Sequence, residues 1–333
     1  MRDFKDYSLK EHNTFGIEAK CSRFLEYETV EEAQQIALLL KESATPYIII
    51  GGGSNLLLTG NFSGIVVHSA LKGYAIEGDR MVCGSGMEWD EIVAISLKAG
   101  LYGAENLSLI PGDVGASAVQ NIGAYGVEVQ DLIECVQMVE IATGQLLTVT
   151  KDACEYGYRQ SCFKQDWKNR YLITRVTYRF SLCFEPKLDY GNIRSELERK
   201  GITTPTAQQL RDTIIDIRRA KLPDPKEEGN AGSFFMNPIV GRRKYELMAA
   251  EYEGMPHYEV DTDHVKIPAG WMIDQCGWKG KTLGRAGVHA KQALVLVNRG
   301  GATGDEIVAL CEAIRRDVYE KFGIMIYPEV NIV

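Results

Sequence analysis

Apolar and polar residues alternate along the chain with two periods, one typical of helices and one typical of strands. After the capping box Thr29–Glu32, apolar residues stand at positions 33, 36, 37 and 40, and this spacing predicts a helix. The run 46–50, Pro-Tyr-Ile-Ile-Ile, predicts a buried strand. That strand leads directly into a cluster of three glycines.

The remaining pattern predicts alternating helices and strands over the whole chain. Strands are expected at 65–67, 80–83, 133–141, 145–150, 171–182, 293–297 and 324–333. Helices are expected at 88–99, 191–200, 206–220, 242–252 and 304–322. Capping boxes open two of these helices, at Thr206/Gln209 and at Thr303/Glu306. The charged turn 221–226 contains two prolines and is predicted to be a domain boundary.

Composition places the chain among globular proteins, since 45% of its 333 residues are apolar and 25% are charged. That length allows two or three domains. The formal net charge of −8 argues against a general nucleic-acid binder, which needs excess Lys and Arg. A small anionic substrate is still possible, because it needs only a local cluster of positive charge.

The eight cysteines form neither a C-x-x-C pair nor zinc-finger spacing with a histidine, so no disulfide framework and no metal site is expected. The N-terminal residues contain no apolar signal region, and no apolar run is long enough to span a membrane. We therefore expect a cytoplasmic protein with reduced thiols.

Two segments are rich in glycine and small residues. The first glycine segment is Gly51–Asn55, and the second is Ile110–Gly126. Glycine lets the backbone approach a ligand closely, so two such segments would suit a ligand with two phosphates. The alternatives are a tight turn for the first and a short helix packed closely on a sheet for the second. Neither is a Rossmann fingerprint or a Walker A motif.

Three single residues could carry chemistry. Arg159 lies among aromatic residues and could clamp a carboxylate, although such an arginine more often forms a surface ion pair. Ser233 lies in a turn of small residues, where a serine is usually only a cap, and no nucleophile elbow surrounds it. Glu329 lies in the apolar terminal segment, where burial would suit a general acid; on its own, exposure on an edge strand is the simpler interpretation.

Taken together and in order, these segments resemble the family of UDP-N-acetylenolpyruvoylglucosamine reductases. The resemblance covers nearly the whole chain. It rests on 13–16, 51–55, 110–112, 120–126, 158–159, 231–235, 269–275, 289, 292–295 and 328–330. Tyr190-Gly191 marks the longer subclass, which has a substrate-covering tyrosine loop.

The resemblance implies an α+β fold with an FAD-binding domain of the vanillyl-alcohol-oxidase type and a smaller α+β substrate-binding domain. It divides the chain into an FAD subdomain at 1–67 with the terminal strand 321–333, a second FAD subdomain at 68–220, and a substrate domain at 221–320. It also implies non-covalent FAD, NADPH as co-substrate, only small-molecule partners and a monomer.

The implied reaction is the NADPH-dependent reduction of the enolpyruvyl ether of UDP-N-acetylglucosamine in peptidoglycan precursor synthesis. Hydride from the reduced flavin reaches C3, so negative charge develops at C2 and in the carboxylate and needs donors placed in advance. The resemblance gives this role to Arg159 and to a protonated Glu329, and it makes Ser233 the proton donor to C2.

The resemblance also assigns binding residues. The FAD contacts would be Gly51, Gly52, Gly53, Ser54, Asn55, Leu56, Pro111, Gly112, Gly115, Ala116, Ser117, Asn121, Ile122, Gly123 and Arg218. The substrate contacts would be Tyr125, Tyr158, Tyr190, Lys221, Asn237, Tyr258, Lys279 and Gln292.

Asp113 departs from this expectation, because an acidic residue near phosphates would repel them, and we expect it to face away from them. Two rival interpretations remain at this stage. One is an FAD-dependent oxidase or dehydrogenase of another sugar or hydroxy acid on the same scaffold. The other is a protein that binds nucleotide sugars without catalysis.

Overall fold

The computed structural model describes residues 1–333, which form two compact units. The first unit contains residues 1–8, 20–52 and 62–220. The second contains residues 9–19, 53–61 and 221–333. The chain therefore crosses between the units several times before position 62, and the last crossing falls between Ala220 and Lys221, at the predicted boundary. The division into three regions stays a prediction.

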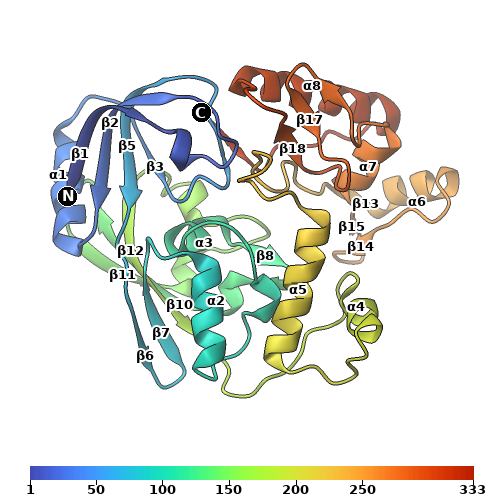
Figure 1. Cartoon of the computed structure of the whole chain (residues 1–333), viewed down its shortest axis with the longest axis horizontal. Coiled ribbons are helices and arrows are strands. Elements are labelled where there is room, and N and C mark those ends of the chain that lie inside the picture. Colours follow the sequence, from blue (N-terminus) through green and yellow to red (C-terminus); the bar gives the residue numbers. More distant parts are fainter. The chain divides into compact units, whose positions relative to one another are not determined.

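The first unit contains two larger sheets and one of two short strands (Figure 1). One has the order β1 (Arg2–Ser8), β2 (Lys20–Tyr27), β5 (Phe62–Ser69) and β3 (Tyr47–Ile50), and all its pairs except β1–β2 are parallel. The other is antiparallel, in the order β11 (Leu146–Thr150), β10 (Ile133–Glu140), β12 (Tyr171–Arg179), β7 (Arg80–Gly84) and β6 (Tyr74–Glu77). The short strands β8 (Gly123–Ala124) and β9 (Val127–Glu128) pair with each other.

Helix α1 (Val30–Glu42) joins the two larger sheets of the first unit, because its buried face shares one apolar cluster with strands of both. The hydroxyl of Tyr27 in β2 also donates a hydrogen bond to the carbonyl of Ile173 in β12, at 2.6 Å. The remaining helices of this unit are α2 (Trp89–Lys98), α3 (Val114–Gln120), α4 (Ile193–Arg199) and α5 (Ala207–Lys221).

The second unit contains three small sheets and three helices. Its sheets are β13 (Ile239–Gly241) with β15 (His264–Lys266) and β14 (Tyr258–Glu259), then β16 (Thr282–Leu283) with β17 (Ala286–Val288) and β18 (Leu296–Asn298), and the parallel pair β4 (Leu56–Leu57) with β19 (Asn331–Ile332). Its helices are α6 (Arg242–Glu251), α7 (Ala269–Gln275) and α8 (Gly304–Phe322). None of the helices combines the length and the hydrophobicity that a membrane span requires.

The helices predicted from capping boxes are confirmed, and all begin where their boxes predict. Thr29, Thr206 and Thr303 each accept a hydrogen bond from the backbone N–H three residues later. The terminal strand predicted at 324–333 is wrong, because only Asn331–Ile332 pair in a sheet. Residues 324–327 do alternate between buried and exposed side chains, so the segment is extended, but the carbonyl of Ile326 accepts a side-chain hydrogen bond from Arg315 at 2.9 Å.

We expect Glu306→Gln to destabilise the protein in a pH-dependent way. Backbone and Arg285 hydrogen bonds at the start of α8 lower the pKa of Glu306 to about 2, from 4.5. A depressed pKa stabilises the fold only while the carboxyl is ionised. The deficit in unfolding free energy should therefore be full above pH 4.5 and should shrink as the pH falls to about 2. Urea titrations of wild type and variant across this window test it. Glu320→Gln, in the last turn of the same helix, is the control, and an equal deficit there would contradict the prediction.

Candidate functional site

The two glycine segments approach each other closely in the first unit. A Cβ atom on Gly51 would lie 3.0 Å from the Cβ of Ala116, and one on Gly52 would lie 3.3 Å from a carboxylate oxygen of Asp113. The second of these would also lie 3.6 Å from the Cα of Gly112. The first glycine segment therefore contributes only backbone at this contact, and it packs against the side chains of Ala116 and Asp113.

The second glycine segment contains the short, closely packed helix that the sequence left open as its alternative. Its first part is a turn around Gly112, at φ 112°, and residues 114–120 form the short helix α3. Gly115 packs this helix closely, since a Cβ there would lie 3.3 Å from the carbonyl oxygen of Ser85. The helix ends at Asn121, which has φ 43°.

Two predicted cofactor contacts, Ser117 and Asn121, use their side chains inside the protein. The Ser117 hydroxyl is buried between the carbonyl of Val114 at 2.7 Å and the Tyr178 hydroxyl at 2.8 Å. The Asn121 amide donates to Glu128 and to the carbonyl of Gly157, both at 2.8 Å. Any contact that these residues make with a cofactor must therefore come from their backbone.

The carboxylate of Asp113 packs against the first glycine segment, and the side chain is mostly shielded from solvent. One of its oxygens lies 3.7 Å from Nε2 of His68, whose Nδ1 lies 2.8 Å from Glu26. Burial lowers the pKa of His68, but the two carboxylates outweigh burial, and the net shift is upward. A positive His68 would offset the charge of Asp113, and no sequence motif indicated this histidine.

Arg159 lies against the second glycine segment. Its guanidinium donates to the carbonyl of Gly123 at 2.5 Å and to that of Asn121 at 3.3 Å. Its own backbone has φ 56°, a conformation that is costly for a residue with a side chain. Its guanidinium carbon lies 5.5 Å from the ring centre of the neighbouring Tyr158.

Tyr125, Tyr190 and Arg218 also come together in the first unit. A Cβ on Gly126 would lie 3.5 Å from the Cβ of Tyr190, which places Tyr190 beside the end of the second glycine segment. Burial lowers the pKa of Arg218 and raises that of Tyr125, while the attraction between this pair opposes both shifts. Tyr125, at φ 49°, is held by Asn106, whose amide donates to its carbonyl at 2.9 Å. Sequence reasoning missed Asn106, because nothing local distinguishes it.

In the second unit, Ser233 and Glu329 lie on adjacent segments. The backbone N–H of Glu329 donates to the carbonyl of Phe234 at 2.8 Å, and Phe235 forms an antiparallel bridge with Pro328. The N–H of Phe234 donates in turn to the carbonyl of Leu294, also at 2.8 Å, which brings the segment that follows Gln292 to the same place.

The first glycine segment ends in this same part of the second unit. Asn55 donates from its amide to the carbonyl of Glu329 at 3.3 Å, and its own carbonyl accepts from the N–H of Asn331 at 3.1 Å. Ser54 and Leu56 flank it, and Leu56 starts β4. Gly53, at φ 68°, leaves no room for a Cβ, because that atom would collide with the carbonyl oxygen of His12.

The predicted substrate residues of the second unit lie on separate elements. Asn237 accepts a hydrogen bond from the N–H of Ala269 at 2.9 Å, at the start of α7. Lys279 is exposed and lies 3.2 Å from a carboxylate oxygen of Asp274. Lys221 is the last residue of α5.

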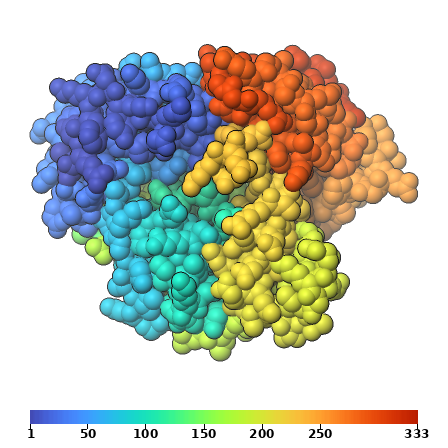
Figure 2. All heavy atoms as spheres, viewed as in Figure 1, coloured from blue at the N-terminus to red at the C-terminus, as the bar shows by residue number.

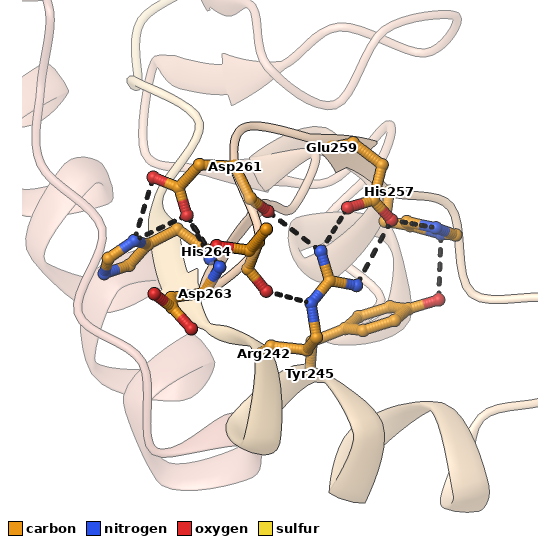
Figure 3. A network of polar contacts seen from close by, with 8 residues as sticks. Arg242, Tyr245, His257, Glu259, Asp261, Asp263 and His264 are labelled. Atoms are coloured by element: carbon orange, nitrogen blue, oxygen red, sulfur yellow. Dashed lines mark hydrogen bonds and ion pairs between the residues drawn. The ribbon is translucent and has the colours of Figure 1, made fainter.

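Tyr258 precedes Glu259 in β14, and Glu259 belongs to a network of polar side chains (Figure 3). Arg242 of α6 pairs with Glu259, and it donates to the carbonyls of Asp261 at 2.9 Å and Thr262 at 2.6 Å. The hydroxyl of Tyr245 lies 2.8 Å from Nδ1 of His257. These contacts tie both ends of the β14–β15 hairpin to α6.

Comparison with known proteins identifies the family. Residues 22–150 match an FAD-binding domain, and residues 224–333 match the C-terminal domain of UDP-N-acetylenolpyruvoylglucosamine reductase. A relative with that name from Bacteroides fragilis (strain YCH46) is 53% identical over 98% of this chain and 99% of its own length. The chain belongs to the UDP-N-acetylenolpyruvoylglucosamine reductase family. A second relative of that name, from Porphyromonas gingivalis (strain ATCC 33277), is 46% identical over 99% of this chain and 98% of its own.

The predicted fold is confirmed as well. The crystal structure of the UDP-N-acetylenolpyruvylglucosamine reductase from Thermus caldophilus aligns with a TM-score of 0.69. It covers 99% of this chain and 98% of its own at 23% identity, so the likeness concerns the fold. With the FAD-binding domain match, it confirms an α+β flavoprotein of the family's type.

The residues present fit FAD. Gly51, Gly52 and Gly112 leave the backbone uncovered by their own side chains where the glycine segments meet, and Arg218 and Arg159 lie near enough for their charges to interact. A dinucleotide pyrophosphate needs such a backbone cradle with positive charge nearby.

We expect Gly53→Ala to lower the unfolding free energy of the flavin-saturated protein. The strain of the left-handed conformation alone costs about 1–3 kcal/mol, and the collision with His12 adds to it. Urea unfolding provides the measurement. Gly60→Ala is the matched control, because a Cβ there meets nothing within 4 Å, and its change should stay within about 0.5 kcal/mol. Similar losses in both variants would show that the His12 contact is unimportant.

Proposed function

We propose that the protein reduces the enolpyruvyl ether of UDP-N-acetylglucosamine to UDP-N-acetylmuramate, with bound FAD as carrier and NADPH as reductant. Family membership at 53% identity over nearly the whole chain supports the reaction, and the FAD-binding domain match supports the cofactor. We further propose a cytoplasmic monomer that handles only small molecules. The observation that carries the assignment of roles is the hydrogen bond between the Glu329 and Phe234 backbones, since it makes Ser233 and Glu329 neighbours.

FAD, when bound, would supply the hydride that the substrate receives. The task of the chain is then to stabilise negative charge on the substrate carboxylate and to provide one proton. Arg159 suits the first task because its position is set before substrate arrives: two carbonyls hold its guanidinium and its backbone is fixed at φ 56°. Donors held in advance need no reorganisation during the reaction.

Ser233 would donate the proton to C2, and Glu329 would be the second donor to the carboxylate. A serine is a weak acid, so it can donate only to a strongly basic carbon. The two residues are on segments joined by backbone hydrogen bonds, and this arrangement supports a shared role.

The substrate diphosphate would be bound by Tyr190, Lys221, Asn237 and Lys279. Asn237 suits this role because its carbonyl oxygen is already used by Ala269, which leaves its NH₂ group to donate. Lys279 is exposed beside Asp274, so a diphosphate would compete for it. Tyr125, Tyr158, Tyr258 and Gln292 would complete the substrate contacts.

An FAD-dependent oxidase on the same scaffold is the rival function, and one experiment separates the two. Purified protein should be yellow, should lose its colour with NADPH under anaerobic conditions, and should regain it on addition of the enolpyruvyl substrate. Recovery of colour only with oxygen would favour the oxidase, and a colourless protein would favour a binding protein.

We predict that Ser233→Ala slows only the half-reaction with the enolpyruvyl substrate. The loss should be roughly 10²–10⁴-fold, which is typical of one positioned acid. Reduction by NADPH should keep its rate, because no carbon is protonated in that half-reaction. Stopped-flow absorbance of the flavin follows both. Normal deuterium incorporation at C2 in deuterated water, at an undiminished rate, would remove Ser233 from this role.

For Glu329, comparison of Gln and Ala variants distinguishes a neutral donor from an anion. A neutral carboxylic acid donates a hydrogen bond, and a glutamine amide can replace it, so Glu329→Gln should lose less activity than Glu329→Ala. Loss of one such donor costs about 2.7–4 kcal/mol of transition-state stabilisation. The same stopped-flow assay measures it in the substrate half-reaction. Equal losses in the two variants would indicate an ionised Glu329 instead.

A further inference from the structure

Leu109 immediately precedes the second glycine segment and has an unusual backbone. Its φ is 57°, in the left-handed region that glycine adopts freely but leucine does not. A side-chain-bearing residue remains in this region only where its surroundings hold it there. Ile110 and Pro111 follow, and then the turn at Gly112, so the conformation of Leu109 sets the direction in which the segment begins.

Both backbone polar groups of Leu109 are held by side chains. Its N–H donates to Oδ1 of Asp90 at 2.5 Å, and its carbonyl accepts from Nε of Arg218 at 3.3 Å. Asp90 lies in the first turn of α2, and Arg218 lies near the end of α5. These two helices lie side by side (Figures 1 and 2).

Asp90 is itself fixed by a second arginine of α5. Arg211 donates from both Nη atoms to the two carboxylate oxygens, at 2.7 and 2.8 Å, in a bidentate pair. Arg211 is only 8% exposed, so this pair is largely shielded from water. Burial raises the pKa of Asp90, but the hydrogen bonds from Arg211 and Leu109 outweigh it and the net shift is downward, so the carboxylate is ionised.

Arg211 and Arg218 are seven residues apart, two turns of the helix, so they lie on one face of α5. One arginine holds Asp90 and the other holds the carbonyl of Leu109. The same face of α5 therefore fixes both polar groups of Leu109, its carbonyl directly through Arg218 and its N–H through Asp90.

We propose that Asp90, held by Arg211, is a positioning residue that keeps Leu109 in its left-handed conformation and thereby sets the second glycine segment to receive the pyrophosphate of FAD. This inference rests on the proposed placement of FAD at that segment. Asp90 acts through the backbone of Leu109.

The test uses FAD affinity and one rescue. Asp90→Ala should raise the dissociation constant for FAD roughly tenfold, because Leu109 then loses what holds its strained backbone. Adding Leu109→Gly should recover most of that loss, since glycine adopts the same φ without strain. Equilibrium dialysis with flavin fluorescence measures the dissociation constant for the full-length protein.

A merely structural pair between α2 and α5 would behave differently. The unfolding free energy would fall in Asp90→Ala, and Leu109→Gly would not restore FAD affinity, so absence of rescue overturns the proposal. An unchanged dissociation constant in a folded Asp90→Ala also overturns it. If that variant does not fold, Asp90→Asn replaces it, because asparagine loses the ion pair with Arg211 that holds the acceptor oxygen against the N–H of Leu109. It should weaken FAD binding measurably, and Leu109→Gly should reverse this; affinity equal to wild type overturns the proposal.

Two control variants distinguish the role of Asp90 from the proposed placement of FAD at the second glycine segment. Asp3→Ala breaks another bidentate pair, with Arg23 at 2.9 and 2.7 Å, and should leave FAD affinity unchanged. Gly112→Val fills the glycine segment itself. Weaker FAD binding in Gly112→Val with normal binding in Asp90→Ala would overturn only the role of Asp90. Normal FAD binding in Gly112→Val would overturn the placement of FAD and the inference together.

Discussion

In the first unit, the two glycine segments can lie so close together only because Gly51 and Gly52 have no side chains. Gly51 and Gly52 approach Asp113 and Ala116 so nearly that a single added carbon on either would press on its neighbour. Because these glycines have no side chains of their own, the backbone of the first segment stays open to close approach by a ligand. His68, which lies between Asp113 and the buried Glu26, gives Asp113 a partner, so its carboxylate can pack against the first glycine segment.

Strained backbone conformations are concentrated around the two glycine segments. Four residues other than glycine have a positive φ in or beside the second glycine segment, namely Leu109, Asn121, Tyr125 and Arg159. Side chains hold three of them: Asp90 and Arg218 hold Leu109, Asn106 holds Tyr125, and the amide of Asn121 bonds to neighbouring loops. Buried polar side chains thus serve the site by fixing backbone, which explains why several predicted contacts have no side chain left for a ligand.

In the second unit, the backbone that carries the proposed site residues is held in place by pairing between segments that are distant in sequence. The short strand β4 follows the first glycine segment and pairs with β19 at the other end of the chain. Gly304 at the start of α8 also lies against the carbonyl of Leu58, with no room for a side chain. These contacts hold the segment of Glu329 between residues 53–57 and the segment of Ser233, although nearly 100 residues separate the two proposed catalytic groups.

The sequence by itself determined the helices that open with a capping box, because such a box and a repeat of 3.6 residues depend only on neighbours in the chain. Thr29, Thr206 and Thr303 all cap as their spacing predicts. The ordered motifs also determined the family, since their combination is specific even where each motif is weak. Tertiary structure decided the strand pairing and the backbone conformations that depend on residues far apart in the sequence. Residues 324–327 have the alternation of buried and exposed side chains that is typical of a strand. However, Arg315 donates a hydrogen bond to the carbonyl of Ile326, and Pro328 has no N–H to donate, so the segment does not form the regular hydrogen bonds of a sheet. Likewise, nothing near Leu109 in sequence indicates a left-handed backbone, because the groups that hold it come from positions 90 and 218.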